Sequence, residues 1–341
     1  MEIETLRREI DERMTRPSKA AVEALGALEG DLVIIGVAGK MGPSLALMAR
    51  RAVDAAGVNK RIIGISRFSD RSVRDALEQA GVTTIQADLL NEAEVARLPE
   101  AGEVIFMAGQ KFGTTGQAHT TWAINALAPA AVAERYKRAR IVVFSSGNIY
   151  PLTSVVRGGA TEEDEASPIG EYAQSVLARE RIFEYFSRKN ETPMVLYRLN
   201  YAVDVRYGVL VDIARAVYAG EPIDLTMGNV NVIWQGDAND RALRAIAHAS
   251  VPPRILNITG PETLSVRWIA EQFGKRLDKR PEFRGEEAEE ALLSNAAASH
   301  RLFGYPSVTA LEMIDWIADW IALGGELWDK PTHFQERKGR Y

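Results

Sequence analysis

The chain has 341 residues, which is long enough for one large or two unequal domains, and its 46% hydrophobic and 26% charged residues are typical of a soluble globular protein. Its formal net charge of −5 argues against nucleic acid or an acidic membrane surface as the main partner. The absence of cysteine excludes disulfides, thiolate nucleophiles and cysteine-bound metals, and the four histidines are too widely spaced to predict a metal site. No apolar run is long enough to span a membrane and no signal-peptide pattern is evident, so we expect a cytoplasmic protein.

Two short helices are predicted ahead of the first strand. Apolar residues recur at helical spacing from Ile3 to Met14, and after a break at Pro17 a second helix is predicted over residues 19–28. Residues 1–30 therefore form an N-terminal helical extension. Its apolar stripe must pack against another surface. The simpler expectation is the chain's own domain, and the alternative is a second copy of the chain.

A strand, a glycine-rich turn and a helix follow. The strand over residues 32–36 runs into three glycines spaced three apart, Gly36, Gly39 and Gly42, and the helix continues to about residue 56. Glycine permits a tight turn whose backbone approaches a phosphate, and the helix N-terminus offers unpaired N–H groups and a partial positive charge. The unit predicts a site for a dinucleotide pyrophosphate, and the alternative is a glycine-rich turn that binds nothing.

Strands continue to alternate with helices as far as residue 199. This alternation predicts a parallel, doubly wound sheet of the Rossmann type, whose ligands lie beyond the carboxyl ends of the strands. Polar or small residues stand at each of those ends, among them Ser66, Arg67, Asp88, Gly109 and Ser146. The further predicted strands cover residues 61–66, 82–86, 103–109, 140–146 and 194–199, and the helices between them cover 73–80, 92–98, 122–138 and 172–189.

The C-terminal third is less regular. Residues 31–200 are expected to form the dinucleotide-binding Rossmann domain, with residues 230–260 returning to it. A smaller C-terminal α/β substrate-binding part would comprise residues 201–229 and 261–328, with helices over 266–277, 287–303 and 308–323. The polar residues 329–341 are expected to be a loose tail.

In addition to the glycine loop, several stretches match the sequence motifs of one known family, and they occur in the same order along the chain. They are residues 107–109 after the fourth strand, the serine pair within 144–150, the helix 172–180, the strand end 198–200, and the two stretches 257–260 and 302–306. From residue 31 to about 323, the chain resembles the extended short-chain dehydrogenase/reductases, in the NAD-dependent epimerase/dehydratase branch. Members of that branch act mostly on sugars and sugar nucleotides.

The resemblance implies a role for each matching residue. Ser146 and Tyr172 would be the catalytic hydroxyls, and Asn200 would contact the substrate. We add Lys111 and Trp234 as expected substrate contacts, from the fourth-strand turn and the variable region 201–236. The expected cofactor-binding residues are Gly36, Gly39, Lys40, Met41, Gly42, Ser66, Arg67, Asp88, Leu89, Met107, Ala108, Gly109 and Asn125.

One position departs from the family motif. Val176 stands where the family has a lysine, four residues after Tyr172. A cation there favours the phenolate, since a free phenol has a pKa of about 10, and valine supplies no charge. Three interpretations stay open: Tyr172 acts only as a proton donor, another cation such as Arg179 or Lys111 substitutes, or the chain binds nucleotide without turnover. For Arg179 itself, a surface salt bridge is the simpler expectation.

The end of the second strand bears on the choice of cofactor. An acid usually holds the ribose diol of NAD there, but this strand ends at Ser66 and Arg67, and Asp70 comes three residues late. Arg67 suits a 2′-phosphate, which arginine can bind through two hydrogen bonds, and Lys40 adds a second cation. NADP is therefore favoured over NAD, although Arg67 has the alternative of stacking on adenine or facing solvent.

The sequence thus predicts an NAD(P)-dependent oxidoreductase, epimerase or dehydratase that acts by hydride transfer on a sugar or sugar nucleotide. The alternative is a catalytically impaired sensor that binds a nucleotide or ligand on the same fold. The family commonly dimerises through two long helices, here residues 122–138 and 172–189, so a homodimer is expected.

Overall fold

Seven parallel strands form the central sheet of the computed structural model, which describes residues 2–111 and 116–340. Their spatial order is β12-β7-β5-β4-β1-β2-β3, so the chain builds outward from β1 first in one direction and then in the other. This order confirms the predicted Rossmann-type doubly wound α/β fold. The strands are β1 Leu32–Ile35, β2 Ile62–Ser66, β3 Thr83–Gln86, β4 Glu103–Phe106, β5 Arg140–Ser146, β7 Met194–Leu199 and β12 Arg254–Ile258.

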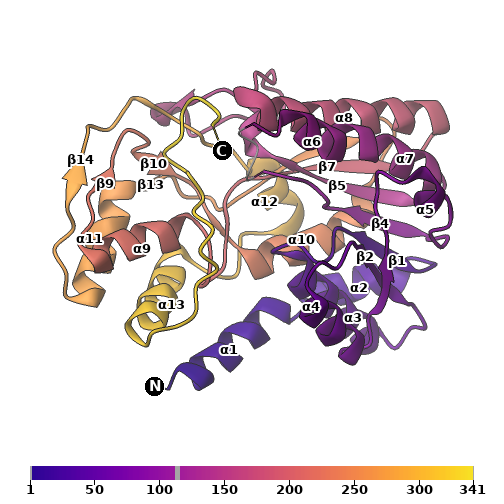
Figure 1. The fold of residues 1–341 in the computed structure, drawn as a ribbon, viewed down its shortest axis with the longest axis horizontal. Helices are drawn as coiled ribbons and strands as arrows, with labels where there is room; N and C mark the ends of the chain where they lie inside the picture. The colour runs from indigo at the N-terminus through magenta and orange to yellow at the C-terminus, as the bar shows by residue number, and fades with distance from the viewer. Residues whose placement is uncertain (1, 112–115, 341) are drawn as a thin grey trace.

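Helices cover both faces of this sheet (Figure 1). Leu32 and Ile34 of β1 point into one core and Val33 and Ile35 into the other, and all four are buried. This explains why the strand reads as a continuous apolar run. The first face carries α2 Lys19–Ala27, α3 Gly42–Ala56, α4 Arg71–Gln79 and α10 Gln235–Ala245, and the second carries α5 Glu92–Ala96, α7 Ala128–Arg135 and α8 Gly170–Asn190.

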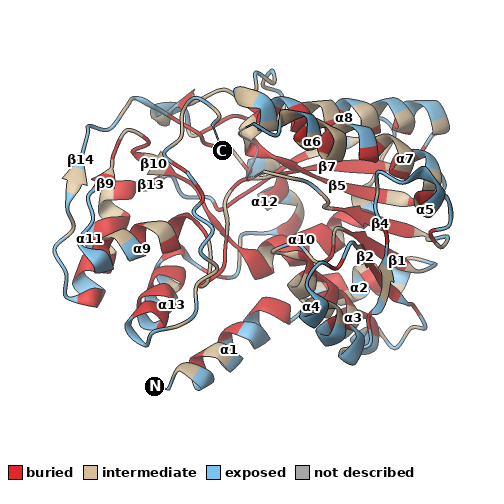
Figure 2. Ribbon diagram, viewed as in Figure 1, coloured by how far each residue is buried: buried red, intermediate tan, exposed pale blue. Residues whose placement is uncertain are grey.

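The C-terminal part has a core of its own, visible as buried segments beside the sheet in Figure 2. Helices α9 Val209–Ala219, α11 Val266–Leu277 and α13 Ala310–Ala322 pack together there. Short strands pair around them: β8 Ala202–Val203 with β11 Ile233–Trp234, β9 Ile223–Asp224 with β14 Phe283–Arg284, β10 Asn229–Val230 with β13 Leu264–Ser265, and β6 Thr153–Ser154 with β15 Glu290–Ala291. Single turns of 3-10 helix occur at Gly147–Ile149, Val155–Arg157 and Ile246–His248.

The N-terminal helices pack on the chain's own fold. In α1 Ile3–Thr15, the side chains of Leu6, Ile10 and Met14 are each only 1% exposed and lie in the same core as α11 and α13. Helix α2 begins after Ser18, whose Oγ accepts a hydrogen bond from Ala21 N at 3.1 Å. Of the two partners considered for the apolar stripe, the chain's own core is the one observed.

Two predicted helices differ from those observed. In place of one helix over 122–138, residues 118–135 form α6 Ala118–Trp122, a π-helical turn at Ala123–Leu127 and α7, and this wide turn carries Asn125. Such turns occur frequently at functional sites. The helix predicted over 287–303 is observed only as α12 Ala297–Phe303, because β15 pairs with β6 and tertiary pairing overrides the helical pattern.

The C-terminal segment is not the loose tail that its polarity predicts. It leaves α13 and crosses the molecule to the C-terminus (Figure 1). Thr332 N and Oγ1 donate to Asp212 Oδ2 at 2.7 and 2.6 Å, and Arg337 Nη1 donates to Thr226 O at 2.8 Å. Phe334 is buried in the core of the C-terminal part. Specific hydrogen bonds, which composition does not reveal, hold the segment in place.

No helix within residues 2–111 and 116–340 is long and apolar enough to cross a membrane. The homodimer stays a prediction. Leu127, at the end of the π-helical turn, and Tyr185 of α8 are exposed on the helices expected to form its interface.

Candidate functional site

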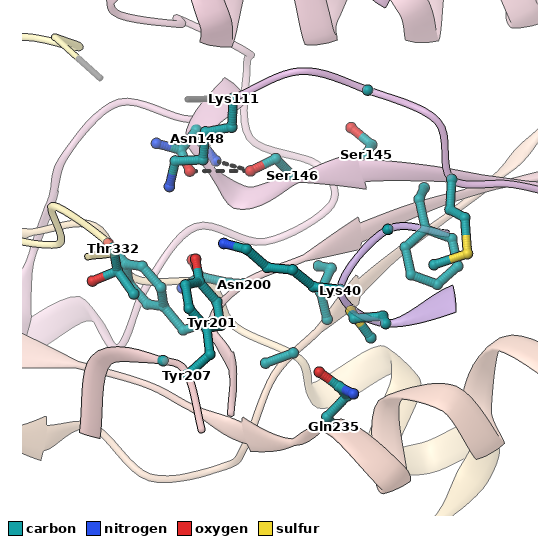
Figure 3. Close-up of a pocket in the computed structure, with 18 of the residues that line it drawn as sticks. Lys40, Lys111, Ser145, Ser146, Asn148, Asn200, Tyr201, Tyr207, Gln235 and Thr332 are labelled. Carbon is teal, nitrogen blue, oxygen red and sulfur yellow. Dashed lines mark hydrogen bonds between the residues drawn. The ribbon is translucent and has the colours of Figure 1, made fainter. Parts of the chain in front are cut away.

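A cleft runs along the carboxyl ends of the strands, in two halves that adjoin at the glycine loop. The half beside β2 and β3, here named the β2 half, is a cavity of about 630 Å³. The half beside β5 and β7, named the β7 half, has a volume of about 430 Å³ and is drawn in Figure 3. Both halves are lined by Gly36, Ala38, Gly39, Met107, Gly109 and Gln110.

The glycine loop has the geometry that a dinucleotide pyrophosphate requires. Gly36 has a φ of +86°, and a Cβ there would lie 2.6 Å from Ala108 N. A Cβ at Gly42 would overlap the carbonyl of Val37, so only glycine lets α3 begin this close to β1. The residue before α3, Met41, makes no side-chain cap, which leaves the first-turn amides and the helix dipole facing the cleft.

The β2 half holds the residues expected to decide between NAD and NADP. Ser66 and Arg67 line it at the end of β2, and Arg67 is exposed. Asp70 also lines it, but its carboxylate caps α4 by accepting hydrogen bonds from Ser72 N at 2.9 Å and Ser72 Oγ at 2.7 Å. At the next strand end, Asp88 Oδ1 accepts from Leu90 N at 3.0 Å.

The β7 half brings the two expected catalytic hydroxyls together. Ser146 ends β5 and Tyr172 lies in the first turn of α8, and both side chains line this half of the cleft. Ser146 Oγ is also 3.0 Å from Asn148 Oδ1, as Figure 3 shows. Burial raises the pKa of the Tyr172 phenol above its ordinary value, although the charge of Arg179 and the nearby Ser146 hydroxyl act in the opposite direction. The Tyr172 phenol is therefore neutral at pH 7 and carries a proton that it could donate.

Arg179 is buried and does not form the expected surface salt bridge. Its Nη1 donates to Phe144 O at 2.9 Å and its Nη2 to Asn125 Oδ1 at 2.8 Å. Burial lowers the pKa of Arg179 to about 10, so the guanidinium remains charged at pH 7. Two acidic residues that could have formed such a salt bridge pair with other arginines: Glu180 with Arg198 and Asp164 with Arg157.

Val176 faces away from this chemistry. It is 1% exposed and packs with Ile149, Tyr150 and Ala160 in a small apolar cluster. It does not line either half of the cleft. Arg179, one turn further along α8, lines the β7 half instead.

Most sequence-predicted site residues line the cleft. Those in the β2 half, including the shared ones, are Gly36, Gly39, Ser66, Arg67, Asp88, Leu89, Met107, Ala108 and Gly109. Those in the β7 half alone are Lys40, Met41, Lys111, Ser146, Tyr172 and Asn200. Lys40 therefore lines the opposite half of the cleft from Ser66 and Arg67, and not the half where it would help them to bind a 2′-phosphate.

Three predicted residues do not line the cleft. Gly42 acts through the close packing of α3. Asn125 is fully buried and accepts a hydrogen bond from Gln110 N at 2.9 Å, so it positions the loop after β4. Trp234 was expected to contact substrate, but it is 1% exposed and packs edge-on against Trp316 with ring centroids 5.1 Å apart.

Other cleft residues were not predicted from sequence. Asn148 lies two residues after the serine pair, so its position in that motif could have identified it as a site residue. Tyr201 has a φ of +48°, a conformation uncommon for a bulky residue and one that clusters at functional sites. Nothing in the sequence pattern distinguishes several other polar lining residues, such as Gln110, Gln235, Lys330 and Thr332. Among the described residues, no cluster of histidine and acidic side chains could hold a metal ion.

Comparisons with known proteins agree with this geometry. The model of the NAD dependent epimerase/dehydratase family matches residues 32–258. The chain is similar to the solved structure of MoeE5 in complex with UDP-glucose and NAD, at 20% identity and a TM-score of 0.67, over 86% of this chain and 99% of that one. No curated protein matches the chain significantly.

Two further solved structures are similar. One is UDP-glucose 4-epimerase from Thermotoga maritima with UDP-glucose, at 15% identity and a TM-score of 0.71, over 86% of this chain and 98% of that one. The other is UDP-glucuronic acid 4-epimerase from Bacillus cereus in complex with UDP-glucuronic acid and NAD, at 16% identity and a TM-score of 0.70, over 86% of this chain and 99% of that one. At these identities the likeness establishes a shared fold.

The glycine packing predicts the effect of one methyl group. We expect Gly42→Ala to push α3 away from Val37 and to weaken binding of NADH or NADPH by about tenfold or more, measured by fluorescence titration. The control is Gly57→Asn at the other end of α3, where φ is +66° and nothing lies within 4 Å of an added Cβ. Unchanged coenzyme affinity in a folded Gly42→Ala protein would contradict the assignment of this loop.

Proposed function

Because this chain belongs to the NAD-dependent epimerase/dehydratase family, we propose that it is an NAD(P)-dependent enzyme acting on a hydroxyl or carbonyl carbon of a sugar nucleotide. The observation that carries the proposal is that Ser146 and Tyr172 line the same cavity, the β7 half, directly beside the glycine loop. The sugar-nucleotide class is supported by similar proteins solved with UDP-glucose or UDP-glucuronic acid.

The chain's own residues would bind the substrate oxygen and move its proton. When bound, NAD or NADP exchanges a hydride with the substrate carbon. Ser146 Oγ accepts a hydrogen bond from Asn148 N, which orients it. Its proton, which Asn148 Oδ1 accepts in this structure, would be donated to the substrate oxygen instead. Tyr172 Oη gives that oxygen a proton as the carbonyl is reduced and takes it back as the hydroxyl is oxidised.

Arg179 would supply the positive charge that Val176 does not. It follows Tyr172 by seven residues, which is two helical turns, so both residues lie on one face of α8. Its charge opposes the effect of burial on the pKa of Tyr172. Its hydrogen bonds to Phe144 O and Asn125 Oδ1 hold the guanidinium in place. Of the open interpretations, a neutral proton donor assisted by this substitute cation is the one we adopt.

Turnover tests the proposed reaction. With NAD or NADP, we expect the protein to convert at least one of a panel of UDP-sugars, followed by chromatography of the products. Tyr172→Phe removes the proton donor and should lower turnover by about 100-fold or more, with coenzyme affinity unchanged. Tyr185→Phe, on an exposed position of the same helix, is the control. Tight coenzyme binding without conversion of any UDP-sugar would support the ligand sensor instead, an alternative that the family match does not favour.

The pH dependence tests the role of Arg179. Oxidation needs Tyr172 as a base, so its rate rises with pH through the pKa of that phenol. Arg179→Leu removes the cation, raises this pKa further, and should shift the rising limb upward by about one pH unit. Val176→Lys added to Arg179→Leu should shift the limb part of the way back.

Arg181→Leu, an exposed position on α8, should leave the pH profile unchanged. A profile that does not move in Arg179→Leu would show that Arg179 has only a structural role.

We propose NADP as the preferred coenzyme. Ser66 and Arg67 line the β2 half, and the nearest acid, Asp70, is engaged in capping α4. Arg67→Ala should weaken NADPH binding by about 10- to 100-fold, as expected for a charge-assisted hydrogen bond to phosphate, and should leave NADH binding nearly unchanged. Arg71→Ala, exposed at the start of α4, is the control. Tighter binding of NADH than NADPH by the wild-type protein would overturn this preference.

A further inference from the structure

One buried polar side chain of the β7 half has no part in the chemistry proposed above. Gln235 is the first residue of α10 and is only 2% exposed, yet it lines the cavity. A buried amide is costly when either of its ends lacks a hydrogen bond. The partners of its nitrogen and of its oxygen therefore indicate what the residue does.

The nitrogen of Gln235 is bound to the helix that follows the glycine loop. Gln235 Nε2 donates to Ser44 Oγ at 3.0 Å, and Asn239 Nδ2, one helical turn later on α10, donates to the same oxygen at 2.9 Å. Ser44 lies in the first turn of α3, and its Oγ donates to Met41 O at 3.0 Å. These bonds fix the first turn of α3 to α10.

The hydrogen bonds of Ser44 determine which way the Gln235 amide is turned. A hydroxyl has one proton, and Ser44 gives its proton to Met41 O, which can only accept. Ser44 Oγ must therefore accept from both amides, so each amide presents its NH₂ group to it. The Oε1 atom of Gln235 consequently faces away from Ser44, and Figure 3 shows it turned towards the cavity.

No donor within residues 2–111 and 116–340 forms a hydrogen bond with Gln235 Oε1. Asn239 Oδ1 also lacks a partner in this part of the chain, but Asn239 is fully buried and does not line the cavity. The two amides thus share Ser44 as a partner and differ in one respect. Only Gln235 presents its oxygen to the space where a ligand binds.

The position of this oxygen indicates which group it would bind. The site proposed above has the pyrophosphate at the start of α3 and the nicotinamide ring beside Tyr172, and the nicotinamide ribose joins the two. Gln235 contacts the first turn of α3 and lines the same half of the cleft as Tyr172. An uncharged acceptor suits the ribose hydroxyls and the carboxamide N–H, which can donate, and does not suit the pyrophosphate, which has no proton at pH 7.

We propose that Gln235 is a coenzyme-binding residue, whose Oε1 accepts a hydrogen bond from the nicotinamide riboside. The donor is a ribose hydroxyl or the carboxamide N–H. The inference rests on the proposed NAD(P) coenzyme. One side chain then serves two parts of the coenzyme site, because its nitrogen fixes the helix start that meets the pyrophosphate and its oxygen holds the end of the coenzyme that reacts.

Two substitutions on α10 test this inference by calorimetry. Gln235→Met and Asn239→Leu each remove one donor to Ser44, but only Gln235→Met also removes an acceptor from the cavity. We expect Gln235→Met to weaken binding of the preferred coenzyme, NADPH or NADH, by about five- to tenfold, as for one neutral hydrogen bond. Its affinity for ADP, which ends at the pyrophosphate, should not change.

Asn239→Leu is the matched control and should leave the affinities for coenzyme and ADP unchanged. Gln235→Leu should behave as Gln235→Met does, and it replaces that variant if the methionine protein does not fold.

A coenzyme analogue distinguishes the two possible donors. The reduced 3-acetylpyridine analogue has a methyl ketone in place of the carboxamide and therefore has no N–H to donate. If Gln235→Met weakens binding of this analogue as much as that of the natural coenzyme, a ribose hydroxyl is the donor. If the analogue binds both proteins equally well, the carboxamide is the donor.

The remaining outcomes would overturn the inference. Equal losses of affinity for coenzyme and for ADP would show that Gln235 acts only through the glycine loop. Unchanged coenzyme affinity in a folded Gln235→Met protein would remove the residue from the coenzyme site and leave the proposed function standing. A wild-type protein that binds neither coenzyme would contradict the proposed function, and this inference with it.

Discussion

The site depends on three close contacts, and in each of them one partner is a glycine. Gly36 meets the backbone of Ala108, Gly42 meets the carbonyl of Val37, and Gly64 lies under the Val37 side chain, where a Cβ would be 2.8 Å from Cγ1. These contacts bring the ends of β1, β2 and β4 together with the first turn of α3. The turn amides, the helix dipole and the strand ends then face one crevice. Larger residues would separate these elements, and the two halves of the cleft would no longer adjoin.

A buried network of charged side chains fixes helix α8. Glu180 of α8 accepts hydrogen bonds from Arg198 Nε and Nη2 at 2.9 and 2.8 Å and from Ser145 Oγ at 2.5 Å. Arg179, its neighbour in sequence, turns towards Asn125 and the end of β5. Fully satisfied buried networks of this kind hold side chains in one geometry. The helix thus places the charge of Arg179 where it acts on Tyr172, while Val176 fills an apolar space.

The sequence predicted the sheet and the cleft because both follow from short-range patterns. Buried parallel strands are continuous apolar runs, glycine spacing reports a tight turn, and strand ends share one edge. The burial of Arg179 and Trp234 depends on contacts with elements distant in sequence. The local pattern therefore predicted, wrongly, that Arg179 lies at the surface and that Trp234 contacts the substrate. The direction of the Lys40 side chain, and the docking of Lys330 and Thr332 by Asp212, are likewise set by tertiary contacts that composition does not encode.

The most direct measurement is a crystal structure of the protein soaked with NADPH or NADH. The account predicts that the pyrophosphate meets the amides at the start of α3, that the adenosine lies in the β2 half, and that the nicotinamide ring enters the β7 half beside the Tyr172 hydroxyl. Reacting atoms should approach to about 3–4 Å once a substrate is also bound. A crevice that stays empty at saturating coenzyme, or a nicotinamide ring that lies outside the β7 half, would contradict the account.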